Sequence, residues 1–135
     1  KKMYEEMRWL NVDKKFGEKM YKTIVINGMD IYKNLYENPA LAHLKRQEFT
    51  ELYNKLTEEE KCIYYDNIRD ILIDTTSLVL GILDGICSLN GGGFFESKVI
   101  IDGEDMKNDM QDSFLAYIQE NDLEWDLKQM MFGKS

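Results

Sequence analysis

The chain has 135 residues, of which 44% are apolar and 12% aromatic, and it contains a single proline. This length and composition predict one folded domain over residues 1–135 and exclude a disordered chain. The net charge of −8 argues against a nucleic-acid-binding surface, and the single histidine excludes a histidine-rich metal site.

The negative charge is concentrated near the carboxyl end. Residues 102–126 hold nine acids and one base, Lys107, so that 1 − 9 = −8 equals the charge of the whole chain. The acids are Asp102, Glu104, Asp105, Asp109, Asp112, Glu120, Asp122, Glu124 and Asp126. Such a local excess concerns partners and solubility rather than fold.

Apolar residues at helical spacing predict the first elements in chain order. One helix is expected over residues 3–10, and a second begins after Asp13 and ends at a turn at Asn27-Gly28. The β-branched residues 23–26 leave a short strand as the alternative for that segment.

A short helix over residues 29–37 should stop before Pro39, because the residue before proline disfavours helical backbone. Asn38 then caps a further helix of about 17 residues that ends near Leu56, with Pro39 in its first turn.

The strongest local signal is the capping box formed by Thr57 and Glu60. It predicts a long helix over about 58–89 that ends at the glycines of residues 90–93. The apolar arc of this helix is so wide that we expect neighbours on most of its sides.

Residues 94–101 read as a short strand, paired either with residues 23–26 or with a short return segment. An amphipathic helix follows, and a last short turn is expected over residues 123–127. The buried face of that helix is predicted to consist of Met106, Met110, Phe114 and Ile118. The expected fold is therefore mainly α, a single-domain helical bundle around the helix at about 58–89, with a small β element near 94–101.

A row of aspartates marks the polar side of the long helix. Asp66, Asp70 and Asp74 are spaced i, i+4 and i+8, so their carboxylates lie side by side and repel one another unless a cation neutralises them. The row is either half of a Mg²⁺ site or the solvated edge of the helix.

Part of this pattern resembles a known enzyme family. Asp70 and Asp74, followed by Gly81, are similar to the second metal-binding helix of some all-α nucleoside triphosphate pyrophosphatases, and Glu48 and Glu51 to that family's first acidic motif. The resemblance implies a Mg²⁺-dependent enzyme in which these four carboxylates converge across two helices. It covers about a quarter of the chain and departs from the family at Ile71, where an acid is usual.

Other chemistry has weaker support in the sequence. An EF-hand loop that starts at Asp102 would need Gly and Glu where Lys107 and Ser113 stand, which leaves only an irregular carboxylate site. Cys62 and Cys87 would lie roughly 37 Å apart on one helix, too far to form a disulfide with each other. Free thiols, no apolar stretch long enough to span a membrane and no secretory signal predict a cytoplasmic protein.

The leading hypothesis is a non-catalytic, acidic interaction protein: an immunity-type or anti-defence inhibitor that needs no cofactor or metal. It would bind a basic protein, such as a toxin, nuclease or defence enzyme, as a monomer or a homodimer. The predicted contact residues are Asp102, Glu104, Asp105, Asp109, Asp112, Glu120, Asp122, Glu124 and Trp125. The Mg²⁺-dependent pyrophosphatase that uses Glu48, Glu51, Asp70 and Asp74 is the alternative.

Overall fold

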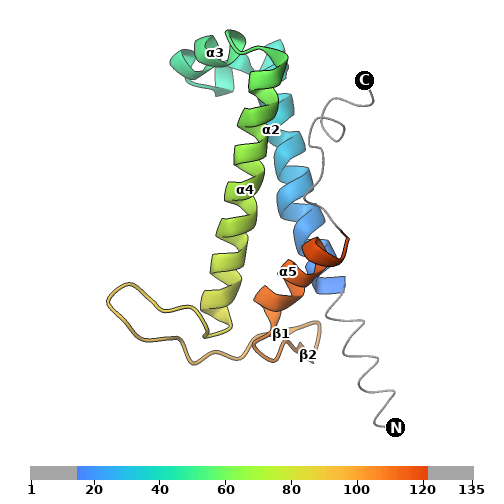
Figure 1. Ribbon diagram of the computed structural model, residues 1–135, viewed down its shortest axis with the longest axis vertical. Coiled ribbons are helices and arrows are strands. Elements are labelled where there is room, and N and C mark those ends of the chain that lie inside the picture. The colour runs from blue at the N-terminus through green and yellow to red at the C-terminus, as the bar shows by residue number, and fades with distance from the viewer. Residues whose placement is uncertain (1–14, 122–135) are drawn as a thin grey trace.

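Two long helical segments run side by side, and a shorter helix lies against one end of them (Figure 1). The computed structural model describes residues 15–121. Residues 15–20 are helical and continue through the π-helical segment η1 (Tyr21–Ile26) into α2 (Asn27–Glu37). The fold is mainly α with a minor β element, as predicted, and the predicted helix over residues 3–10 lies outside the described residues.

The predicted turn at Asn27-Gly28 is wrong, because the helix runs through it without a break. The alternative strand over residues 23–26 is wrong as well, since these residues are π-helical. Val25 and Met29 are completely buried, and a Cβ on Gly28 would be in ordinary van der Waals contact with Leu72 of α4 (Glu58–Leu83), at 3.4 Å. The burial of this segment in the core overrides the local turn signal.

The end of α2 before Pro39 is confirmed, and the side chain of Asn38 accepts a hydrogen bond from Ala40 N at 3.0 Å. The helix of about 17 residues expected next is divided into the 3-10 helix η2 (Pro39–Leu44) and α3 (Gln47–Asn54). Extended backbone at Lys45 and Arg46 separates the two. The Lys45 ammonium lies 3.9 Å from the centroid of the Tyr36 ring, and this cation–π contact favours the break.

The capping box of α4 (Glu58–Leu83) is confirmed: Glu60 N donates to Thr57 Oγ1, and Thr57 N donates to Glu60 Oε1. The helix ends six residues before the predicted Leu89. Gly85 has a left-handed φ of 75°, and Gly81 O accepts hydrogen bonds from both Ile86 N and Cys87 N. The chain thus leaves the helix at Gly85 rather than at the triple glycine.

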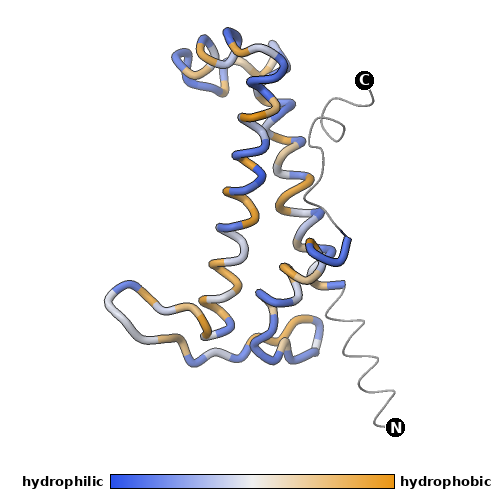
Figure 2. Tube along the Cα trace, viewed as in Figure 1, coloured by the Kyte–Doolittle hydropathy of each residue, from blue (hydrophilic) through white to orange (hydrophobic). Residues whose placement is uncertain are grey.

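The long helix α4 is central, but the prediction that it has neighbours on most of its sides is wrong for the described residues. Among the described residues, α4 meets η1, α2 and α5 (Met110–Glu120) along one side and α3 at its amino end. Ile63, Ile71 and Leu78 each remain more than half exposed. Apolar and polar residues alternate along most of α4, whereas residues 78–83 at its end contain no polar side chain (Figure 2).

The β element is a minimal hairpin. β1 (Ile100–Ile101) pairs antiparallel with β2 (Glu104–Asp105), with Ile100 opposite Asp105. The turn residues Asp102 and Gly103 both have positive φ, as a tight two-residue hairpin requires. The pairing partner of β1 is therefore the short return segment. Of the strand predicted over residues 94–101, only residues 100–101 are a strand, and residues 94–99 are irregular.

The amphipathic helix is confirmed as α5 (Met110–Glu120), with Met110, Phe114 and Ile118 buried in the core beside Met106. The helix crosses residues 15–20 closely, since a Cβ on Gly17 would lie 2.4 Å from the carbonyl oxygen of Ser113. The turn expected over residues 123–127 lies outside the described residues. Within residues 15–121, no helix combines the length and apolarity needed to cross a membrane.

Candidate functional site

The acidic segment follows the hairpin and α5. Asp102 occupies the exposed turn, Glu104 and Asp105 lie half-buried on β2, and Asp109 precedes the first turn of α5. Exposed Asp112 and Glu120 lie at opposite ends of α5. The remaining predicted contact residues, Asp122, Glu124 and Trp125, lie outside the described residues.

These acids do not form one compact patch. Eleven residues separate Asp109 from Glu120, which is about 16 Å along a helix. Part of the charge is used within the hairpin: Lys107 N donates to Asp105 Oδ1 at 2.8 Å, and Lys98 Nζ lies 3.8 Å from Asp105 Oδ2. The structure thus presents an acidic ridge that runs from the hairpin turn along α5.

Asp84 has a structural role that the sequence pattern does not reveal. It is only 3% exposed, and its carboxylate accepts hydrogen bonds from Met110 N at 3.1 Å and Gln111 N at 2.8 Å. The side chain of Asp109, at the cap position of α5, makes no capping bond. Asp84 therefore caps α5 from the end of α4, and no local signal links residues 26 positions apart.

The four carboxylates of the pyrophosphatase hypothesis do not come together. Glu48 lies 3.9 Å from Arg46, and Glu51 accepts from Gln47 Nε2, both on or next to α3. Asp70 lies 12 residues into α4, about 18 Å from the start of that helix. Among residues 15–121, no group of three or more acidic, histidine or cysteine side chains is placed to hold a metal ion.

Residues 102–109 all belong to this described part, and they hold no such group either. The irregular carboxylate site predicted there is therefore not formed among the described residues. Cys62 and Cys87 are both free thiols, as predicted.

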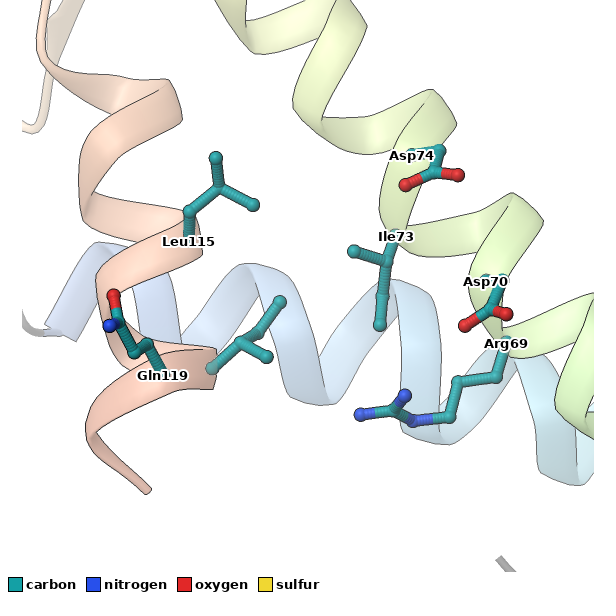
Figure 3. A pocket seen from close by; sticks show the side chains of 7 residues that line it. Arg69, Asp70, Ile73, Asp74, Leu115 and Gln119 are labelled. Atoms are coloured by element: carbon teal, nitrogen blue, oxygen red, sulfur yellow. The ribbon is translucent and has the colours of Figure 1, made fainter. Parts of the chain in front are cut away.

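A cavity of about 490 Å³ lies between α4 and α5 (Figure 3). Its lining residues are Arg69, Asp70, Ile73 and Asp74 of α4 and Leu115, Ile118 and Gln119 of α5. The carboxylates of Asp70 and Asp74 lie one turn apart at one side of this cavity, and the Arg69 side chain extends below them. Arg69 is 5% exposed, and its Nη2 donates to the Tyr21 hydroxyl at 3.5 Å.

The cavity combines apolar walls with two exposed carboxylates. This combination suits an alkyl chain that ends in a cation, because the chain packs on apolar carbon while the charge stays near acids. The sequence singled out Asp70 and Asp74 but not Leu115 or Gln119, since only the packing of α5 on α4 places these residues together.

A buried aromatic cluster joins α2, α3 and α4 at the far end of the molecule. The Tyr53 hydroxyl donates to Glu37 Oε1 at 2.5 Å and lies 2.6 Å from the Tyr65 hydroxyl. Burial, the largest cause, raises the pKa of Tyr53, and the hydrogen bond to Glu37 raises it further. Burial also raises the pKa of Tyr64, and it raises the pKa of Tyr65 to about 12. These phenols are therefore neutral near pH 7, and the role of the cluster is to hold α2, α3 and α4 together.

The chain matches no protein-family model, no curated protein and no solved structure. The functional argument therefore depends on the geometry and charge of the chain itself.

Proposed function

We propose that the protein is a non-catalytic, cytoplasmic interaction protein of the immunity or anti-defence type, which binds a basic partner protein. The contact surface consists of the acidic ridge together with the acids that follow it in residues 122–126. The single observation that supports this is the segregation of charge, because residues 102–121 contain six acids and only one base, Lys107. Complementary charge of this kind accelerates association and sets specificity.

The packing of the elements that carry the acidic ridge is consistent with this proposal. Met106, Met110 and Phe114 are each at most 2% exposed, so they anchor the hairpin and α5 in the core. Charged side chains on such anchored elements keep their spacing, whereas those on a loose loop would have to be ordered on binding.

The test is affinity capture from an extract of the source cell with three forms of the full chain. The first is the native chain. The second is neutralised on the ridge by Asp105→Asn, Asp109→Asn, Asp112→Asn and Glu120→Gln. The third loses the same charge elsewhere through Asp30→Asn, Glu48→Gln, Glu51→Gln and Glu96→Gln, four acids that are all exposed.

We expect the native chain and the third form to capture the same stoichiometric basic protein, and the ridge variant to lose it. The captured complex should weaken as salt rises, because exposed charges are screened. Equal capture by all three forms, or no basic protein captured at low salt, would refute the proposal.

A further inference from the structure

One side of α4 presents large apolar side chains to solvent. Ile63 is 70% exposed, Ile71 and Leu78 are each 53% exposed, and Val79 is 49% exposed. At 100° per residue these four positions fall within an arc of about 160°, which they share with the exposed polar residues Asn67 and Thr75. We call these four residues the α4 stripe.

The segment that follows α4 carries further exposed apolar side chains. The chain between α4 and β1 projects from the end of α4, on the side away from α2 and α5 (Figure 1). It carries Phe94 and Phe95, which are 59% and 50% exposed. Large exposed apolar surface of this kind marks an interaction site.

The α4 stripe has an acidic border. Asp66, Asp70 and Asp74 are exposed and lie at about −60°, −20° and +20° from Ile63, so the row follows the edge of the stripe at Ile63 and Asp74 falls just inside its arc. No ion pair joins any of the three to another described residue. Beyond this edge lies the cavity between α4 and α5, and Asp70 and Asp74 line it. Stripe, acidic edge and cavity are therefore adjacent.

Charge decides which occupant fits this surface. If a second copy packed its α4 antiparallel about a two-fold axis, the acidic edges would face each other and repel. An anionic membrane surface would be repelled by the same three carboxylates. A helix with an apolar face and a basic flank has neither penalty, since its cations would neutralise the aspartate row.

We infer that the α4 stripe binds an amphipathic helix of a partner protein whose basic flank lies on Asp66, Asp70 and Asp74. A lysine or arginine from that flank extends over the acidic edge into the cavity. Its alkyl chain packs on Ile73 and Leu115, and its charged head stays near Asp70 and Asp74 at the rim. The buried guanidinium of Arg69, held against Tyr21, keeps a second cation from the cavity floor.

This inference goes beyond the proposed function, because it assigns a basic partner helix to a different surface. The acidic ridge takes no part in it. The failure of one therefore leaves the other standing, and one set of variants separates them.

The probe is a displayed library of helical peptides of about 21 residues, the length that spans Ile63 to Val79 with a margin at 1.5 Å per residue. Leu and Ile occupy one face, and each flanking position is an equal mixture of Lys, Glu and Gln. Selection uses the native full chain. We expect the selected peptides to be enriched in Lys on one flank.

Binding of a selected peptide is then measured with four variants. Ile71→Asp and the pair Asp70→Asn/Asp74→Asn should each weaken it by at least about 10-fold, as for central contact residues. The matched control is Ile31→Asp on α2, where the native side chain is 63% exposed, and it should bind like the native chain. The ridge variant should also bind normally. Circular dichroism verifies that all four variants are folded.

Three results would overturn the inference. One is a library that yields no binders, or binders without basic enrichment on a flank. Another is equal binding by the Ile71→Asp variant. The third is a different occupant: a dimer in light scattering that Ile71→Asp dissociates, or binding to vesicles of phosphatidylserine and phosphatidylcholine that the same substitution abolishes.

Discussion

The contact that links α4 to α5 offers the sharpest test of the structure. Asp84 is 3% exposed and accepts hydrogen bonds from the amides of Met110 and Gln111, at the amino end of α5. The substitution Asp84→Asn keeps the shape of the side chain but removes its charge and one of its two acceptor oxygens. Asp84→Ala removes both acceptors.

The expected loss follows from these two bonds. A hydrogen bond to a charged group contributes about 1.5–3 kcal/mol, and a buried amide left without a partner costs about 1–3 kcal/mol. Asp84→Asn should therefore lower the free energy of unfolding by about 1.5–3 kcal/mol, and Asp84→Ala by about 3–5 kcal/mol. Because small domains have a total stability of only about 5–15 kcal/mol, the alanine variant should lose a large fraction of the stability of the fold.

Urea denaturation followed by circular dichroism measures the change, with amide hydrogen exchange as a local readout. The amides of Met110 and Gln111 should exchange faster in Asp84→Asn. The control is Asp112→Asn, which removes the same charge from the first turn of α5 at an exposed position and should change stability much less. The reasoning fails if both variants unfold at the same urea concentration, or if Asp84→Asn unfolds like the native chain.

Three further predictions concern stability. Gly17→Ala would place a Cβ 2.4 Å from the backbone oxygen of Ser113 and should destabilise the protein by about 1–3 kcal/mol in urea denaturation; an unchanged midpoint would contradict the close crossing. Thr57→Ala removes the capping box and should cost about 1 kcal/mol, whereas Thr57→Ser should retain it; equal losses would show that the hydroxyl does not cap α4. Because the pKa of Tyr65 is raised from 10.0 to about 12, its stabilising effect is complete below pH 10 and is lost as pH rises from 10 through 12. The free energy of unfolding, measured by urea denaturation between pH 9 and pH 12, should fall by at least about 1.4 kcal/mol per pH unit once tyrosine titrates in the unfolded chain. It should fall less steeply in Tyr65→Phe, and parallel profiles would argue against this burial.

Several elements were predictable because the interactions that define them are local. The Thr57 capping box, the end of α2 before Pro39 and the tight turn at Asp102-Gly103 each depend on residues within four positions of one another. The buried face of α5 follows from a spacing of four residues. Backbone geometry and periodicity are sufficient for such features, and the mainly α fold follows from them.

Other features depend on contacts between residues that are far apart in the chain. Gly28 signals a turn, yet it lies within a continuous helix whose neighbouring residues Val25 and Met29 are buried in the core. Asp84 is typical of a solvated helix position in the sequence. In the structure it is buried at the end of α4, where it accepts hydrogen bonds from the first amides of α5.

The same reason applies to the candidate sites. The acidic ridge is visible in the composition of residues 102–126, because net charge needs no coordinates. The cavity beside Asp70 and the exposed stripe at Ile71 and Leu78 are not visible, because the sequence marks a residue as apolar without saying whether another helix covers it. Periodicity determines which residues share a face, and only the packing of α2 and α5 against α4 determines which face remains open to a partner.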